Sequence, residues 1–310
     1  MLIYINMNFA EEKINLLDER VSYYNYLFKQ TFFSKINLFF RHPIKALLRK
    51  IILLFFRKSP ILVRTKTFWG DNMNIFSYEN TLWFCGFLSS ATEINLTKYF
   101  LKNIKDGDVF FDVGAHHGFY SLLVKNILKD RGHIYSFEPS PIHFSILKNN
   151  LYNKNIVLNN TALYSESCKL TFYENIKGTS TINKDFFKIK KTFDKKSFKE
   201  IVVPSVTMDY YCRKNNVFPT VIKIDTEGSE YDILVGANFV LESFSPVILM
   251  EVWDSSYNNE NHLKAVKFLI NKGYSMYEIC DDLSEVKIGG YHLDNHLLNL
   301  KGINNFLFKK

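Results

Sequence analysis

Two glycines, an aspartate and two histidines follow one apolar run, within the stretch VFFDVGAHHGFYSLL at residues 109–123. Gly114 and Gly118 allow a tight turn and let a ligand approach the backbone closely. Asp112 and Ala115 lie on either side of Gly114. The spacing G-x-x-x-G, preceded by a carboxylate, differs from the G-x-G-x-x-G of a pyrophosphate-binding loop. A carboxylate repels phosphate and attracts an ammonium group, so these four residues predict the binding of S-adenosylmethionine.

A second carboxylate lies where the adenosine part of such a ligand is held. Glu138, in the stretch SFEPSP, follows the second predicted strand and lies 20 residues beyond Gly118. A carboxylate at that point accepts hydrogen bonds from the two ribose hydroxyls. Enzymes that bind NAD also carry an acid there, so Glu138 predicts adenosine binding without separating the two cofactors.

Acidic side chains gather after the strand predicted at residues 220–225. If the methyl group of S-adenosylmethionine goes to a hydroxyl, the protein must align that acceptor and supply a group that takes its proton. Asp225 and Glu227 are candidates for this base or for positioning the acceptor, and Asp225 also borders the predicted cofactor site. Together with Glu251 they are alternatively candidate ligands for Mg²⁺, because hard oxygen ligands suit that ion. A further interpretation is that Glu227 and Glu230 only cap the following helix.

The two histidines of the glycine loop lie at the edge of the predicted pocket. His116 is a candidate general base, because an imidazole titrates near neutral pH. The alternative is that His116 and His117 form a hydrogen-bonding wall of the pocket.

These residues need a scaffold in which strands and helices alternate. Strands are predicted at 109–114, 133–138, 155–160, 220–225, 246–252 and 274–279, and helices at 120–128, 142–152, 229–240 and 260–272. Strands joined by helices of this length form right-handed crossovers and a parallel sheet covered on both faces. The pattern predicts a doubly wound, mostly parallel α/β domain that begins near residue 90. Residues 68–90 are predicted to form a hairpin.

The N-terminal part has a different composition. Between Glu19 and Asp71 the chain carries basic residues and no acidic residue. A helix that opens at Pro43 would place Leu47 and Ile51 on one apolar face. Such a helix could lie on an anionic membrane, or it could pack on its own domain or on a second subunit. We therefore divide the chain into a basic, helical extension at 1–67 and a methyltransferase domain at 68–310.

Composition limits the setting and the partners. The 310 residues have a net charge of +8, which allows an anionic partner without choosing one. The four cysteines are isolated from one another, so neither a zinc site nor a disulfide framework is predicted. No uncharged apolar stretch reaches the ~18 residues of a membrane span. We expect a cytoplasmic protein, with possible peripheral contact to the inner face of a membrane.

Five motifs taken together resemble the FkbM family of S-adenosylmethionine-dependent methyltransferases. They are GDVFFDVGAHHGFYSLL, SFEPSP, VTMDYY, VIKIDTEGSEYDILVGA and PVILMEV, and the resemblance covers about residues 85–310. The family usually carries asparagine where this chain has His116. The resemblance implies a class I, Rossmann-like sheet of seven strands and O-methylation of a sugar, a glycan or another natural product.

Two other functions are weaker predictions. The positive charge is compatible with methylation of nucleic acids, but the chain lacks Pro-Pro and has no proline directly before a cysteine. Amino-methylating and cytosine carbon-5 enzymes commonly carry such motifs, so nucleic acid is an unlikely partner. A non-catalytic module of the same fold is disfavoured by the intact Asp112, Glu138 and Asp225. An oligomer stays possible.

Overall fold

The computed structural model describes most of the chain. The described residues are 2–28, 43–44, 47, 51, 60–152, 154–175, 180–182, 198–254, 259–289, 293, 297 and 299–310. They form two compact units, Met1–Lys102 and Asn103–Lys310. The boundary predicted between residues 67 and 68 falls within the first unit and stays a prediction.

The first unit contains helices and one hairpin. Its elements are α1 (Leu2–Phe28), β1 (Leu62–Lys66), β2 (Asn72–Phe76), α4 (Asn80–Cys85) and α5 (Ala91–Asn103). The Lys98 ammonium lies 2.6 Å from the Asp18 carboxylate and joins α5 to α1. The hairpin predicted at 68–90 is wrong in its pairing: its first part contains one strand, which pairs with a strand before residue 68, and its second part contains a helix. The antiparallel partners are β1 and β2, whereas residues 80–85 form α4.

The predicted basic helix around residues 43–55 lies mostly outside the described residues. Of its apolar face, Ile44, Leu47 and Ile51 are described as helical, and Ile44 and Leu47 expose 73% and 54% of their surface. Among the described residues, none of the helices combines the length and the apolarity that crossing a bilayer requires.

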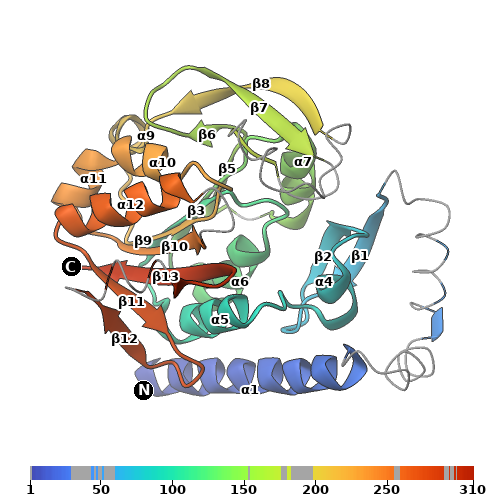
Figure 1. The fold of residues 1–310 in the computed structure, drawn as a ribbon. Coiled ribbons are helices and arrows are strands. Elements are labelled where there is room, and N and C mark those ends of the chain that lie inside the picture. Colours follow the sequence, from blue (N-terminus) through green and yellow to red (C-terminus); the bar gives the residue numbers. More distant parts are fainter. Residues whose placement is uncertain are drawn as a thin grey trace. The chain divides into compact units, whose positions relative to one another are not determined.

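The second unit is built around an eight-stranded sheet with the order β12-β11-β13-β10-β9-β3-β4-β5 (Figure 1). Its strands are β3 (Val109–Val113), β4 (His133–Phe137), β5 (Ile156–Asn159), β9 (Val221–Ile224), β10 (Val247–Trp253), β11 (Ser275–Ile279), β12 (Glu285–Ile288) and β13 (Ile303–Lys309). Neighbouring strands from β5 to β10 are parallel, and β13 is antiparallel to both β10 and β11.

The predicted doubly wound sheet is therefore confirmed, with β12 as an eighth strand at its edge. A smaller sheet is separate and contains β6 (Ala162–Leu163), β7 (Lys169–Asn175) and β8 (Phe198–Val206) in the order β6-β8-β7. The parallel strands are apolar over almost their whole length because they are covered on both faces. Phe111, Ile222 and Met250 are fully buried within them.

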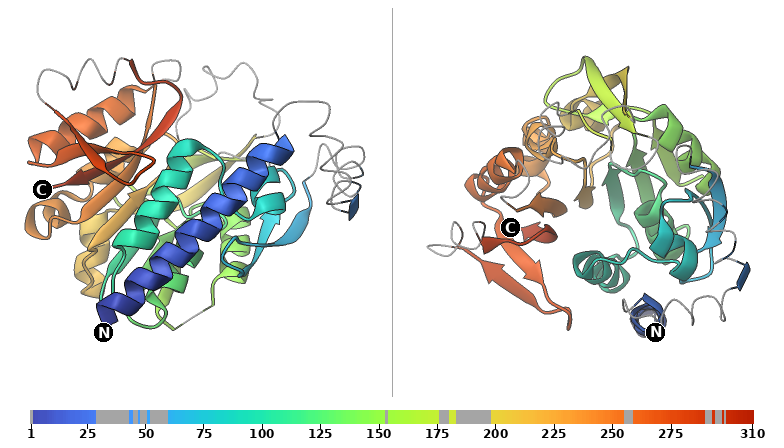
Figure 2. Two further views of the ribbon diagram at one scale, coloured as in Figure 1. Left: turned by 90° about the horizontal axis from the view of Figure 1, so that it is seen from below. Right: turned by 45° about the vertical axis from the view of Figure 1, so that its right-hand side comes forward.

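Helices cover the two faces in two groups. The first group follows β3 and β4 and contains α6 (Phe119–Leu128) and α7 (Pro141–Asn150). The second group lies around β9 and β10 in the sequence. It contains α9 (Met208–Asn215), which precedes β9, and α10 (Glu230–Val235), α11 (Asn238–Ser243) and α12 (Glu260–Asn271), which follow β9 and β10. From β3 the chain adds strands toward one edge of the sheet (β4, β5), and from β9 it adds β10 toward the opposite edge. Right-handed crossovers in opposite directions place the two groups of helices on opposite faces (Figure 2). The strand order reverses between β3 and β9, and ligands of such sheets bind there, beyond the carboxyl ends.

The helix predicted at 229–240 is two helices, α10 and α11. They are separated at Gly236, where an added Cβ would lie 2.1 Å from the Tyr164 carbonyl oxygen. The chain bends at this point because another backbone segment passes in contact with it.

Candidate functional site

The glycine loop joins β3 to α6 and is held tightly by its neighbours. Gly114 and Gly118 have φ values of +83° and +88°, a region that L side chains rarely adopt. A Cβ on Gly114 would lie 1.9 Å from the Asp225 carbonyl oxygen. The amides of Gly114 and Ala115 both donate to the Phe137 carbonyl at 3.0 Å. Gly114 is therefore required for contact with the end of β9, in addition to any ligand.

Asp112 lies buried near the end of β3. Its Oδ2 accepts a hydrogen bond of 2.5 Å from Ser121 Oγ, and its Oδ1 has no hydrogen-bond partner among the described residues. Burial raises the pKa of Asp112, while the nearby Lys223 ammonium lowers it. A buried carboxylate oxygen without a donor offers a place for a cationic group.

Glu138 connects the glycine loop with the segment after β4. Its Oε2 accepts from the His116 amide at 2.9 Å and its Oε1 from the Ser140 amide at 2.8 Å. Burial raises the pKa of Glu138 to about 7 despite these two bonds. Each carboxylate oxygen has a second lone pair, which can still accept from a ribose hydroxyl.

The side chain of Asp225 is paired with a buried lysine. Lys223 lies opposite Asp112 in the register of β3 and β9, and its Nζ lies 2.8 Å from Asp225 Oδ2. The Lys223 side chain is almost fully buried, while 26% of the Asp225 side chain is exposed. A charged lysine in a buried strand is costly without a partner, so the two aspartates account for its position. The charge of Asp112 also raises the pKa of Glu138, and the charges of Lys223 and Asp225 act on the pKa of Asp112. Asp112, Glu138, Asp225 and Lys223 are therefore close enough to influence one another.

The turn after β9 is organised by Glu230. Its Oε1 accepts from the amide and the hydroxyl of Thr226, both at 3.0 Å, so Glu230 caps this turn. Glu227 has a φ of +59°, which is unusual for a residue other than glycine. The Glu227 carbonyl accepts from Thr181 Oγ1 at 2.9 Å. The turn thus holds Glu227 in a strained conformation, as residues of functional sites often are.

Glu251 lies inside β10 and accepts a hydrogen bond of 2.6 Å from the Trp253 indole. Burial, together with the charges of Asp225 and Glu227, raises the pKa of Glu251 well above its usual value. The three acids are close enough to influence one another. Within the described residues, however, their oxygens do not form a group of three potential metal ligands. The geometry therefore gives no support to Mg²⁺ at Asp225, Glu227 and Glu251.

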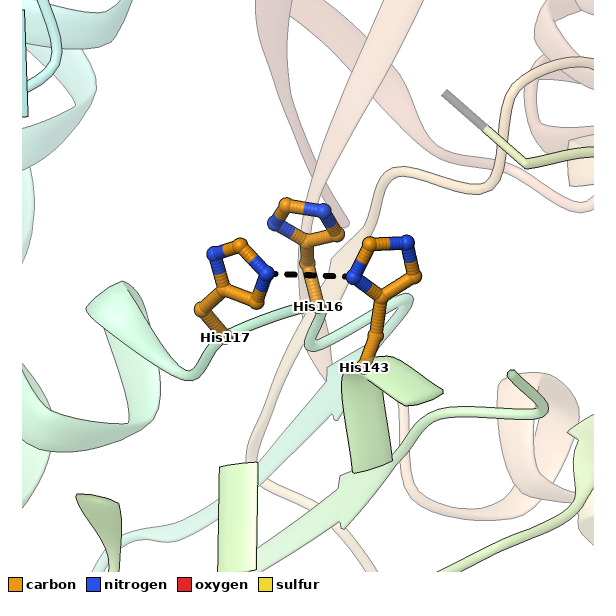
Figure 3. A group of neighbouring side chains, drawn as sticks. All are labelled: His116, His117 and His143. Carbon is orange, nitrogen blue, oxygen red and sulfur yellow. Dashed lines mark hydrogen bonds between the residues drawn. The ribbon is translucent and has the colours of Figure 1, made fainter. Parts of the chain in front are cut away.

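Three histidines meet beside the glycine loop (Figure 3). His116 and His117 come from the loop, and His143 comes from the first turns of α7. The His116 ring lies over the other two, with centroid distances of 3.8 Å to His117 and 4.2 Å to His143. Burial lowers the pKa of His116 well below its usual value, and the adjacent histidines lower it further. His116 is therefore neutral at pH 7 and a weaker base than an ordinary histidine.

The comparisons with known proteins identify the family. Residues 112–276, more than half of the chain, match the methyltransferase FkbM domain. The chain belongs to the FkbM methyltransferase family. The matched domain runs from Asp112 to β11, so it contains the glycine loop, Glu138, Asp225, Glu227 and Glu251.

Relatives of this FkbM chain are distant. Methyltransferase sdnD from Sordaria araneosa is 23% identical over 185 residues, which are 51% of this chain and 71% of that protein. The crystal structure of methyltransferase FkbM from Methylobacillus flagellatus is 14% identical with a TM-score of 0.44. That match covers 68% of this chain but 46% of the other, so the chain spans less than half of that protein. Fibrillarin from Aeropyrum pernix, solved with S-adenosylmethionine, is 13% identical over 66% of this chain and 67% of its own, with a TM-score of 0.37.

Sequence reasoning missed two residues of this FkbM domain. Lys223 is the lysine of a strand that is otherwise apolar, and that contrast was a usable signal. His143 follows Glu138 by five residues, but sequence spacing alone does not show that it faces His117. The remaining predicted residues lie along the carboxyl ends of β3, β4, β9 and β10, although Asp112 and Glu251 lie within their strands.

Proposed function

We propose that this FkbM-family protein transfers a methyl group from S-adenosylmethionine to a hydroxyl oxygen of a sugar, a glycan or another small natural product. The observation that carries the proposal is the position of Asp112, Glu138 and Asp225 where the strand order reverses. Family membership and the relative named as a methyltransferase support the reaction class.

The described residues fit this cofactor. Asp112 Oδ1 is a buried acceptor without a donor and suits the cofactor's ammonium group. Glu138 has free lone pairs for the ribose hydroxyls, and the backbone of Gly114, Ala115 and Gly118 allows close approach. When bound, S-adenosylmethionine would supply an electrophilic methyl group on a sulfonium.

The chain must also handle the acceptor proton. In the proposed transfer, the methyl group would leave the sulfur for the acceptor oxygen, and a side chain of this protein would take the hydroxyl proton. Asp225 suits this role because Lys223 fixes one of its oxygens while the side chain stays partly exposed. Glu227 is the second candidate, for positioning the acceptor. Burial, and then the charges of Asp225 and Glu227, raise the pKa of Glu251, so the neutral form of Glu251 is favoured beside these two acids.

Transfer of a radiolabelled methyl group to a panel of sugars, glycans and RNA tests the proposal. We expect label on a hydroxyl-bearing small molecule or glycan. Asp225→Asn should lower turnover at least about 100-fold, the usual range for loss of a base, with less change in the Kd of S-adenosylhomocysteine. Asp106→Asn, which changes an exposed aspartate at an ion pair with Arg131, is the control and should retain activity.

Three results would contradict parts of this proposal. Tighter binding of NAD than of S-adenosylhomocysteine would remove the cofactor assignment. Label on RNA alone would replace the acceptor class. An equal loss of cofactor affinity and turnover in Asp225→Asn would make Asp225 a cofactor-binding residue and leave Glu227 as the candidate base.

A further inference from the structure

The histidine cluster has no role in the proposed methyl transfer, and its geometry suggests one of its own. One imidazole nitrogen from each of His116, His117 and His143 can be chosen so that all three lie within 4.8 Å of one another. Figure 3 shows the three rings gathered on one side of the glycine loop, with His117 and His143 facing each other. We propose that these three histidines bind a divalent transition-metal ion of the zinc class.

The spacing of the nitrogens is close to that of a zinc site. Zn–N bonds of 2.0–2.1 Å in a tetrahedral site place two ligand nitrogens about 3.3 Å apart. His117 Nε2 and His143 Nδ1 are 3.1 Å apart. One His116 nitrogen already lies within 4.8 Å of the other two, but the His116 ring is stacked on its neighbours. The ring must therefore turn about its side-chain torsions to direct a nitrogen lone pair at the ion.

The tautomer of His143 is already suitable for a ligand. His143 Nε2 lies 3.1 Å from the Asn175 carbonyl oxygen, which can only accept a hydrogen bond. The proton of His143 is therefore on Nε2, and the lone pair of Nδ1 is directed at His117. Backbone carbonyls hold metal-binding histidines in this way and increase the basicity of the coordinating nitrogen.

Metal binding would replace one hydrogen bond. In the described structure His117 Nε2 donates to His143 Nδ1, since Nδ1 carries the lone pair. The His117 proton must move to Nδ1 of the same ring, so that Nε2 becomes a ligand atom. Ligation requires the neutral form of each ring, because the metal ion takes the place of a proton on the coordinating nitrogen.

The backbone around the three ligands is fixed by further bonds. The His116 amide donates to Glu138, and the His117 carbonyl accepts from Asn150 Nδ2 at 2.8 Å. His143 follows the helix cap formed by Ser140 Oγ, which itself donates to Glu174 at 2.6 Å. The Glu174 carboxylate brings negative charge close to His143, whereas the Lys223 ammonium brings positive charge close to His116.

The donor set determines the class of metal. Three imidazoles without a thiolate suit zinc, and also copper, iron or nickel, whereas magnesium and calcium prefer oxygen ligands. Three protein ligands leave a fourth position for water. The bound ion would link the loop between β3 and α6 to the first turns of α7. It would thereby restrain the loop that borders Glu138, whether or not the protein transfers methyl groups.

Metal titration of the full chain, purified without a polyhistidine tag and stripped with a chelator, tests the site. With Co²⁺ as a spectroscopic substitute for zinc, we expect a tetrahedral visible absorption band that saturates at one ion per chain. Zn²⁺ should displace Co²⁺ and raise the Tm. His117→Ala and His143→Ala should each weaken Zn²⁺ binding at least about 100-fold. His133→Ala, which removes an exposed histidine of β4, is the matched control and should leave the affinity unchanged.

The wild-type titration is decisive even if a variant fails to fold. Absence of a tetrahedral Co²⁺ band in the wild-type chain would overturn the proposal. So would Zn²⁺ binding that is equally tight in folded His117→Ala and in the wild type, since the ion would then be elsewhere. The result does not depend on the methyl-transfer assay, so failure of the two proposals can be told apart.

Discussion

Glu138 illustrates how one carboxylate can serve the fold and a ligand together. It accepts amide bonds from His116 and Ser140, and burial still raises its pKa to about 7. An acid whose pKa is raised in the folded state is most favourable to folding when it is protonated. Its contribution to stability is therefore present below pH 4.5 and is lost as the pH rises through about 7.

Cofactor binding should show the opposite pH dependence. The ionised Glu138 carboxylate is the better acceptor for ribose hydroxyls, so S-adenosylhomocysteine should bind up to about tenfold more tightly at pH 8 than at pH 6. Glu138→Gln should lower the affinity and remove most of this dependence, whereas Glu166→Gln, at an exposed position, should retain it. Calorimetry at a series of pH values measures both. A wild-type affinity that is constant over this range would contradict the assigned role.

Gly114 provides a second prediction for a single residue. Gly114→Ala combines a positive φ with a Cβ 1.9 Å from the Asp225 carbonyl oxygen. Gly107 shares the positive φ, at +91°, but no atom of the described residues lies within 4 Å of its added Cβ. Gly107→Ala should therefore lower the free energy of unfolding by about 1–2 kcal/mol through backbone strain alone. Gly114→Ala should cost a further 1–3 kcal/mol or so, because overpacking is added to strain.

Urea denaturation compares these two glycine variants directly. The difference between them isolates the contact between the glycine loop and the end of β9. Equal losses of stability would mean that this contact relaxes without cost, and that Gly114 is needed only for its backbone angle.

At the level of secondary structure, the turn between β9 and α10 depends on Glu230. This buried side chain accepts from two groups of Thr226 and lies 3.4 Å from His262 Nδ1. Glu230→Ala leaves the partly buried donors of Thr226 and the buried Gly228 amide without this acceptor, so the free energy of unfolding should fall by about 2–4 kcal/mol. Turnover should fall as well, because the turn carries Asp225 and Glu227.

Glu260→Ala is the matched control for this prediction. Glu260 is an exposed glutamate in the first turn of α12, paired with Lys264 at the surface. Its removal should change the stability by less than about 0.5 kcal/mol. Thermal and urea unfolding of both variants would show whether the buried cap differs from the exposed acid; similar losses would refute a special role for the turn.

At the scale of the whole molecule, the basic N-terminal stretch still suggests contact with an anionic membrane. Ile44, Leu47 and Ile51 are exposed apolar residues among many lysines and arginines. Each basic side chain near such a surface contributes about 1 kcal/mol, and salt screens this attraction. We predict that the full chain sediments with anionic vesicles, less so at high salt. Leu47→Ser together with Ile51→Ser should weaken the salt-resistant part.

Vesicles of neutral lipid are the control for the electrostatic attraction between the basic side chains and anionic lipid. A chain that ignores anionic vesicles even at low salt would show that this stretch has another partner, such as its own fold or a second subunit.

The sequence alone determined the α/β alternation, the glycine loop and the acids at the strand ends, because these depend on local periodicity and on short motifs. It also indicated the family, through blocks such as VIKIDTEGSEYDILVGA. Apolar strands that alternate with helices leave few topologies, since crossovers are right-handed. The type of a single element was predicted less well, since residues 80–85 form a helix and not a strand. Thr65 Oγ1 donates to the Leu82 and Trp83 carbonyls of this helix, a tertiary contact that local propensity does not contain.

Only the tertiary structure decided which distant side chains meet. Register across β3 and β9 brings Lys223 beside Asp112, and packing of α7 against the glycine loop brings His143 to His117. Neither contact follows from spacing along the chain, because the partners are separated by more than twenty residues and joined through other elements. Burial, which shifts the pKa of Glu138 and of the histidines, is likewise a property of the packed molecule.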